Sequence, residues 1–131
     1  MHKILVVEDE KALLQACCTI LANAGYGVDA AKNGMEAFDK IDESTYDAVL
    51  TDMMLPYATG AEITHKVRAT PHNAAAKVVV MSAMDEEDIV YEVKHMGADG
   101  YMQKPIRAGE LLSKLALLLG KEEERVKQQE T

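Results

Sequence analysis

Four apolar segments of this sequence are each followed directly by side chains that can take part in chemistry. The set comprises three carboxylates, a hydroxyl and an amine: Glu8 and Asp9, Asp52, Ser82 and Lys104. A single acidic residue after a strand is usually a helix cap or part of a solvated turn. Four such positions in this order favour one shared site instead.

The carboxylates determine the chemistry that such a site could perform. Two carboxylates about 4 Å apart repel each other by roughly 4 kcal/mol at an effective dielectric of about 20, so three of them call for a cation. Carboxylate oxygens in an open, hydrated site suit Mg²⁺. A carboxylate is also a competent nucleophile toward phosphorus. Lysine and serine side chains can stabilise charge on a transferring phosphoryl group.

Strand-like and helical patterns alternate along the chain and would position these groups. Short apolar runs predict strands at 3–7, 28–31, 46–51, 78–81 and 100–103. Apolar residues three and four apart predict helices around 13–24, 33–41, 63–67, 85–96 and 107–119. This alternation indicates an α/β domain with a parallel sheet covered on both faces. The carboxyl ends of the strands then share one edge, where ligands bind.

Single residues indicate where some of these elements begin and end. Asn33 is expected to cap the second helix, and Gly97 is expected to end the fourth. Pro56 and Gly60 predict a loop after the third strand.

Length and composition limit the classes of protein that fit. The chain has 131 residues, the size of one domain, which we place at residues 1–120, followed by a charged extension or linker at 121–131. A net charge of −8 disfavours direct binding to nucleic acid. No apolar run reaches the roughly 18 residues of a membrane span, so we expect a cytoplasmic protein. The adjacent Cys17 and Cys18 are expected to be reduced thiols, at least one of them in the core.

Longer motifs surround the reactive side chains. They are ILVVEDE at the first strand, AVLTDMMLP with Gly60 at the third, VVVMSA at the fourth and GADGYMQKP at the fifth. Over residues 3–119 the chain resembles the receiver domains of two-component response regulators, including chemotaxis regulators. The resemblance implies a flavodoxin-like, doubly wound sheet of five parallel strands in the order 2-1-3-4-5, with five helices. It also implies a cis peptide bond before Pro105.

The resemblance assigns a role to each residue at the carboxyl edge. Asp52 would be the phospho-acceptor. Mg²⁺, or Mn²⁺ in its place, would be held by Glu8, Asp9, Asp52 and the backbone carbonyl of Met54, with Asp9 a more direct ligand than Glu8. The remaining roles concern the response to phosphorylation: Ser82 and Lys104 would contact the phosphoryl group, and Ser82 and Tyr101 would act as switch residues.

By the same resemblance the chain would be a phosphorelay switch. A sensor histidine kinase or a histidine phosphotransfer protein would donate the phosphoryl group, and the face formed by residues 85–119 would then change its binding to a downstream target or to a second copy. The protein would not be a turnover enzyme, since it would catalyse only its own phosphorylation and slow dephosphorylation. The resemblance fits both a protein that acts alone and one with an output domain.

Some residues depart from the family pattern. Thr59 stands where an acidic or amide residue is common, and Tyr57 stands where a small residue is common. Met54 and Met84 flank the expected phosphoryl site at positions that tune the lifetime of the phosphate.

Four other classes of protein are alternatives for these strand-end carboxylates. Phosphatases of the haloacid dehalogenase type need a second Asp two residues after the nucleophile, where this chain has Met54. Dinucleotide-binding and FMN-binding sites fit poorly, because Glu8-Asp9-Glu10 after the first strand would repel a phosphate. A receiver-like interaction module that is never phosphorylated stays open, although the combination of Asp9, Asp52 and Lys104 disfavours it.

Overall fold

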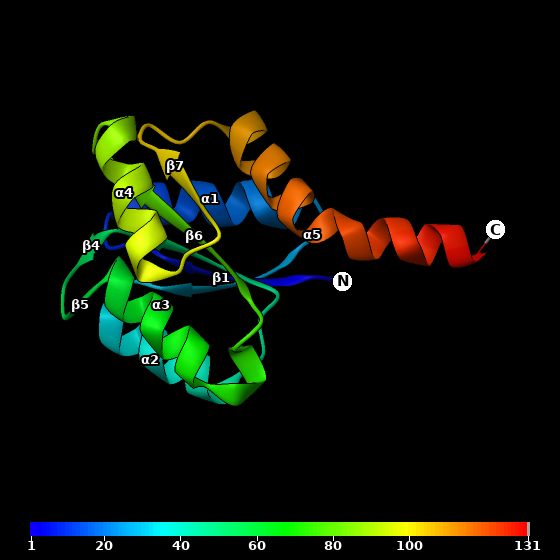
Figure 1. Ribbon diagram of the computed structural model, residues 1–131, viewed down its shortest axis with the longest axis horizontal. Helices are drawn as coiled ribbons and strands as arrows, with labels where there is room; N and C mark the ends of the chain where they lie inside the picture. Colours follow the sequence, from blue (N-terminus) through cyan, green and yellow to red (C-terminus); the bar gives the residue numbers. More distant parts are fainter. Residues whose placement is uncertain (131) are drawn as a thin grey trace.

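The computed structural model describes the backbone of residues 1–130 and the side chains of residues 1–120. Its main sheet has five parallel strands in the order β2-β1-β3-β6-β7 (Figure 1). They are β1 (Lys3–Val7), β2 (Gly27–Ala31), β3 (Ala48–Asp52), β6 (Lys77–Ser82) and β7 (Gly100–Gln103). Counted within this sheet alone, the order is 2-1-3-4-5, so the expected doubly wound topology is confirmed.

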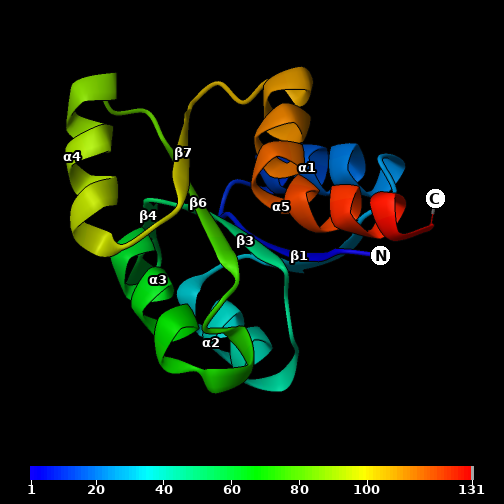
Figure 2. The same ribbon diagram turned by 45° about the vertical axis from the view of Figure 1, so that its right-hand side comes forward.

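Helices cover both faces of the sheet (Figures 1 and 2). One face packs against α1 (Lys11–Asn23) and α5 (Ala108–Glu130), and the other against α2 (Gly34–Glu43), α3 (Gly60–Ala69) and α4 (Glu86–Met96). The helix α4 is the most lightly packed of the second group, because only Ile89 and Val93 are buried and its remaining residues are exposed or half-buried. The five expected helices are therefore confirmed.

The core consists of two layers because successive strand residues point to opposite faces. In β1, Ile4 and Val6 pack with α1 and α5, whereas Leu5 and Val7 pack with α2, α3 and α4. All four side chains are fully buried. This explains why the central strands are continuous apolar runs rather than alternating ones.

The sequence signals for helix ends are confirmed. The Asn33 side chain accepts a hydrogen bond of 2.9 Å from the backbone N–H of Glu36 and so caps α2. Gly97 ends α4 with a φ of 79°, a left-handed conformation that glycine adopts without strain.

Both cysteines are free thiols, as expected from the sequence. Burial, together with the nearby Cys18, raises the pKa of the buried Cys17 to about 11.

The segment after Asp52 differs from the expected loop. It forms a small antiparallel hairpin of β4 (Met54–Leu55) and β5 (Ala58–Thr59). Tyr57 occupies the turn with a φ of 70°, a conformation more usual for glycine. The strand β3 also begins later than expected, at Ala48, because the backbone N–H of Tyr46 donates to the Asn73 side chain.

Two further elements depart from the expected boundaries. A short 3₁₀ helix, Pro71–Asn73, precedes β6 and was not expected. The backbone of α5 continues to Glu130, beyond the predicted end at residue 119. The side chains of the expected extension at 121–131 lie outside the described residues.

The hairpin packs directly on the first residue of α2. The backbone N–H of Gly34 donates to the Pro56 carbonyl at 3.0 Å. A Cβ atom at Gly34 would clash with the Ala58 Cβ and would lie 3.0 Å from the Ala58 nitrogen. Only glycine therefore permits this close approach of α2 to the hairpin that follows Asp52.

We expect Gly34→Ala to lower the free energy of unfolding by about 1–3 kcal/mol, because the added methyl group meets backbone that cannot move freely. Urea denaturation monitored by circular dichroism would measure the change. Gly109→Ala is the matched control, since a Cβ at Gly109 meets nothing within 4 Å. Equal stability of Gly34→Ala and the wild type would contradict this account of the hairpin.

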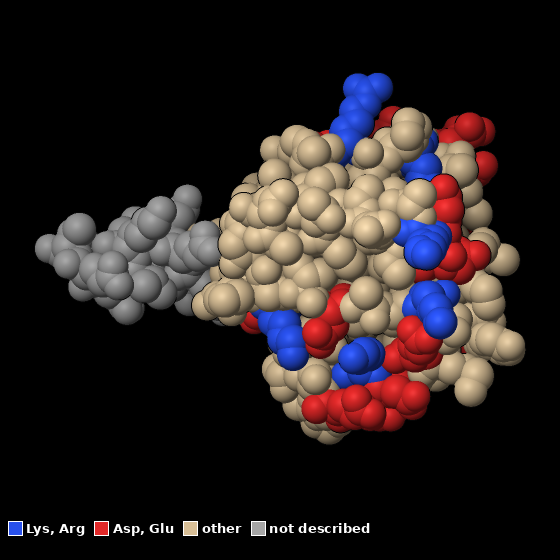
Figure 3. Space-filling model, turned by 180° about the vertical axis from the view of Figure 1, so that it is seen from behind, with Lys and Arg blue, Asp and Glu red and all other residues tan. Residues whose placement is uncertain are grey.

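Charge is unevenly distributed over the surface. The sequence contains no charged residue from Ala12 to Val28, a range that includes nearly all of α1. Figure 3 views the molecule from the side on which α1 lies and shows a broad area without Lys, Arg, Asp or Glu. Among the described residues, no helix has the length and apolar character needed to span a membrane.

Candidate functional site

The reactive side chains predicted from the sequence meet at the carboxyl edge of the sheet. Glu8 and Asp9 directly follow β1, and Asp52 is the last residue of β3. One carboxylate oxygen from each of these residues lies within 4.8 Å of the others. Glu8 and Asp52 are buried, whereas Asp9 is exposed. The cluster is therefore accessible from solvent through Asp9.

Lys104 brings the opposite charge to this cluster from the end of β7. Its ammonium Nζ lies 2.9 Å from Asp52 Oδ2 and 3.4 Å from Glu8 Oε2. The backbone N–H of Lys104 donates to the Ser82 carbonyl at 2.8 Å, which fixes the end of β7 beside β6. The peptide bond from Lys104 to Pro105 is cis, as expected from the sequence.

Burial raises the proton affinity of the Glu8 carboxylate. Its side chain is 1% exposed, and loss of solvation is the main reason that the pKa of this carboxyl rises from 4.5 to about 7. The hydrogen bond from the backbone N–H of Glu10 lowers the pKa, the negative charge of Asp52 raises it, and Lys104 lowers it. Near neutral pH, Glu8 therefore exists in both protonation states.

The ammonium of Lys104 is stabilised by the same cluster. Burial by itself would lower the pKa of Lys104, but the hydrogen bond and negative charge of Asp52, with a further contribution from Glu8, outweigh this effect and raise it. Lys104 thus stays positively charged beside the two buried carboxylates. The arrangement holds the Asp52 carboxylate and a fixed cation in contact.

The donor set also fits a divalent metal ion. Three carboxylates whose oxygens lie within 4.8 Å of one another match the hard oxygen ligands that Mg²⁺ prefers, and the exposed Asp9 leaves room for water ligands. Met54 begins β4 two residues after Asp52, and its side chain is 68% exposed. The role of its carbonyl as a fourth protein ligand stays a prediction.

The two expected switch residues occupy different surroundings. Ser82 is buried at the end of β6, and its hydroxyl oxygen accepts a hydrogen bond of 3.0 Å from the Met84 backbone N–H. Tyr101 is half-buried, and its hydroxyl donates to Glu86 Oε1 at 2.9 Å. The Lys114 ammonium lies 5.5 Å from the centre of the Tyr101 ring. Tyr101 is therefore tied to α4 and α5 rather than to Ser82.

Sequence reasoning missed two residues beside the site. Gln103 Nε2 donates to the Met84 carbonyl at 2.9 Å, and Glu86 accepts from Tyr101. The sequence did contain a signal for Gln103: it lies two residues after Tyr101 in β7, so both side chains project from the same face of the strand. Gln103 reaches the segment that joins β6 to α4, and Tyr101 reaches the first residue of α4.

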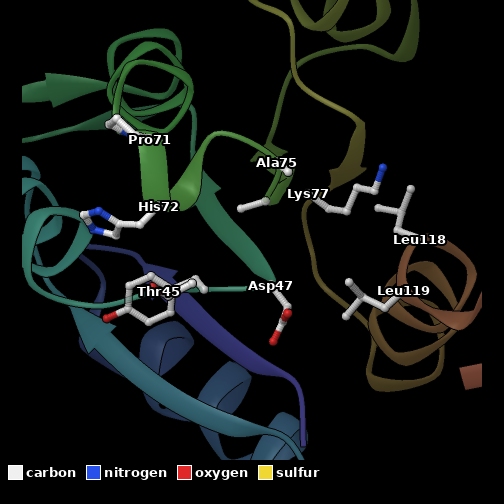
Figure 4. A pocket seen from close by; sticks show the side chains of 10 residues that line it. Thr45, Asp47, Pro71, His72, Ala75, Lys77, Leu118 and Leu119 are labelled. Carbon is white, nitrogen blue, oxygen red and sulfur yellow. The ribbon is translucent and has the colours of Figure 1, made fainter. Parts of the chain in front are cut away.

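Two hollows in the surface differ in their relation to the site. A groove of about 590 Å³ begins at Lys104 and is lined by Leu13, Pro105 and Ile106 among others. A cavity of about 420 Å³ lies at the opposite edge of the sheet (Figure 4). Its lining includes Asp47, which precedes β3, Lys77, which begins β6, and Leu118 and Leu119 of α5. Only the first hollow adjoins the carboxylate cluster.

Carboxylates and a lysine at the carboxyl edge of a doubly wound sheet are the arrangement of a signal receiver domain. Residues 4–116 match the family of response regulator receiver domains. The chain therefore belongs to this family, and the resemblance noted from the sequence motifs is confirmed.

Relatives with known names agree with this assignment. The transcriptional regulatory protein DltR of Streptococcus agalactiae is 35% identical over 115 residues, which cover 88% of this chain and 50% of DltR. The response regulator MprA of Mycobacterium sp. is 34% identical over 117 residues, which cover 89% of this chain and 50% of MprA. The chain thus spans about half the length of these relatives.

Solved structures show the same fold. The chemotaxis response regulator CheY4 of Vibrio cholerae superposes with a TM-score of 0.85 at 29% identity, covering 91% of this chain and 99% of that one. The receiver domain of the sensor histidine kinase PA1611 from Pseudomonas aeruginosa gives 0.82 at 26% identity, covering 91% and 98%. That structure is described with a magnesium ion coordinated in the active site cleft.

Proposed function

We propose that this chain receives a phosphoryl group on Asp52 from a phosphohistidine of a sensor histidine kinase or a histidine phosphotransfer protein. The observation that carries the proposal is the contact of 2.9 Å between the Asp52 carboxylate and the Lys104 ammonium, within a cluster that also contains Glu8 and Asp9. Membership of the receiver family supports the same reaction.

In the proposed reaction, an Asp52 carboxylate oxygen attacks the phosphorus atom. A new oxygen–phosphorus bond forms as the phosphorus–nitrogen bond breaks, and the imidazole remains on the donor. Glu8, Asp9, Asp52 and the Met54 carbonyl would hold Mg²⁺, which would supply positive charge beside the phosphoryl oxygens. Lys104 supplies a second positive charge from the protein itself.

Docking of the phosphodonor is supported by the groove beside Lys104. Its lining includes the apolar side chains Leu13, Pro105 and Ile106. An apolar helix that carries the phosphohistidine could rest there, which would bring the phosphoryl group to the edge occupied by Asp52.

The proposed output is a change in the face formed by residues 85–119. A phosphoryl group adds about −1.5 to −2 charge, to which Lys104 and the Ser82 hydroxyl can respond. Movement of Ser82 would let Tyr101 leave Glu86 and turn inward, biasing a two-state equilibrium. The partner of this face is a downstream target or a second copy. We propose no direct contact of this face with nucleic acid, because the chain carries a net charge of −8.

Two features of the proposal stay predictions. The boundary at residue 120 between the receiver and its extension lies within α5 (Ala108–Glu130). The location in the cytoplasm rests on the sequence and on the usual location of the family.

We expect intact-mass analysis to show a single phosphoryl-sized gain after incubation with acetyl phosphate and Mg²⁺. The gain should be lost when a chelator replaces Mg²⁺, because the carboxylate cluster then repels the incoming phosphoryl group. Mn²⁺ should restore it. A wild-type protein that gains no mass, even with a panel of histidine kinases, would instead support the unphosphorylated interaction module.

A further inference from the structure

The backbone of Met84 is held from two sides. Met84 lies in the β6–α4 loop, residues 83–85, between the buried Ser82 and the start of α4. Its N–H donates to the Ser82 hydroxyl oxygen at 3.0 Å, and its carbonyl accepts from Gln103 Nε2 at 2.9 Å. The loop is therefore tied to the last residue of β6 and to the last residue of β7.

A second contact from β7 reaches the residue where α4 begins. Tyr101 and Gln103 project from the same face of the strand because they are two residues apart. The Tyr101 hydroxyl donates to Glu86 Oε1, and Gln103 donates to Met84. Two neighbouring side chains of one strand thus hold residues 84 and 86 in their present positions.

We propose that Gln103 is a positioning residue that keeps the β6–α4 loop in its resting position and thereby limits the response of Ser82 to phosphorylation. The inference rests on the proposed function, since the response in question is to a phosphoryl group on Asp52. It concerns Gln103, whose side chain touches neither the acidic cluster nor Lys104 in any hydrogen bond of the described residues.

A response of Ser82 to phosphorylation requires an exchange of hydrogen bonds in the β6–α4 loop. When the Ser82 Oγ atom itself moves toward a phosphoryl oxygen, it leaves hydrogen-bonding distance of the Met84 N–H, which then loses this acceptor. An N–H without an acceptor is costly, and Met84 is an exposed residue, so its N–H would pair with water as the loop moves outward. That movement separates the Met84 carbonyl from Gln103. The Gln103 contact therefore favours the resting arrangement and opposes the phosphorylated one.

Removing the contact should shift the loop equilibrium without weakening the fold. The Gln103 side chain is exposed, so its loss costs little buried surface. A single neutral hydrogen bond corresponds to about a three- to tenfold change in an equilibrium constant. The fraction of molecules competent for phosphorylation should rise by the same factor while that fraction is small.

The test compares Gln103→Met, which keeps the side-chain length but cannot donate, with Gln15→Met. Gln15 is an exposed glutamine on α1 and provides the matched control. Amide hydrogen exchange of Met84 and of Leu50 in β3 is followed by NMR. The rate of labelling by acetyl phosphate with Mg²⁺ is followed by intact mass.

We expect Gln103→Met to speed exchange at Met84 and labelling of Asp52 by about three- to tenfold each, with exchange at Leu50 unchanged. In a Ser82→Ala background the same substitution should leave the labelling rate within about twofold, because Gln103 acts through Ser82. A merely structural role would speed exchange at Leu50 and Met84 together.

Unchanged exchange at Met84 would overturn the inference whether or not the wild type is labelled. Faster exchange with a labelling rate equal to that of the wild type and Gln15→Met would also overturn it. A wild type that is not labelled at all would refute the proposed function, and with it the link from Gln103 to phosphorylation. The exchange data would still report the Gln103–Met84 contact itself.

Discussion

Replacing Asp52 with asparagine is expected to abolish phosphorylation of this chain by acetyl phosphate and by any histidine kinase that phosphorylates the wild type. The amide keeps the size of the side chain but is not a nucleophile toward phosphorus. We expect the labelling rate to fall by at least about a thousandfold. Neither Glu8 nor Asp9 should take over, because Glu8 is 1% exposed and Asp9 does not end a strand of the sheet.

The matched control is Asp39→Asn, an exposed carboxylate on α2 that is remote in sequence from the cluster. It should be labelled like the wild type. Circular dichroism should show that Asp52→Asn remains folded, because the substitution removes one of the two buried, mutually repelling carboxylates. Undiminished labelling of Asp52→Asn at another residue would show that the phospho-acceptor has been assigned wrongly.

The stability of the metal-free protein should fall as the pH rises through neutrality. The pKa of Glu8 is raised from 4.5 to about 7 in the folded protein, chiefly by burial. Between these two pH values the folded state therefore binds more protons than the unfolded state. The protonated Glu8 stabilises the folded state fully below about pH 4.5, and this stabilisation is lost as the pH rises above about 7. We expect the free energy of unfolding to fall by up to about 3 kcal/mol between about pH 5 and pH 8.

Glu8→Gln isolates this contribution because a glutamine cannot ionise. Urea denaturation in the presence of a chelator should give a curve that is nearly flat over the same pH range, and the variant should exceed the wild type in stability at about pH 8. Glu10→Gln, which changes an exposed neighbour, is the control. Asp29, whose pKa is lowered mainly by its hydrogen bond from Tyr46, contributes a constant stabilisation over this range, which is lost only as the pH falls below about 4.

A wild-type slope that persists unchanged in Glu8→Gln would contradict the assignment of the raised pKa to Glu8. Mg²⁺ offers an independent check. At about pH 8 it should stabilise the wild type more than Glu8→Gln, because the ionised carboxylate repels its neighbours less when a cation is bound.

The main features of this fold could be read from the sequence for a simple physical reason. Parallel strands buried on both faces must be continuous apolar runs, and the side chains that follow them must converge at one edge. Glu8, Asp52 and Lys104 were found in this way. Asn33 and Gly97 were found because helix ends have local requirements that single residues satisfy.

Other features depend on contacts that no local pattern encodes. The hairpin after Asp52 has strands of two residues and a turn with Tyr57 in a left-handed conformation, where a glycine would have marked the turn. The raised pKa of Glu8 comes from burial by distant segments. The contact of Gln103 with Met84 depends on the path of a loop that the alternation of strand and helix leaves open.

The light packing of α4 means that this helix can open on its own. Burial of Ile89 and Val93 stabilises it by about 1.5–3 kcal/mol for each side chain, whereas a whole domain is stable by about 5–15 kcal/mol. Its amide protons should therefore exchange through local opening rather than through global unfolding. A signal that acts on α4 has to overcome only this local free energy, and the rest of the domain can stay folded while it does so.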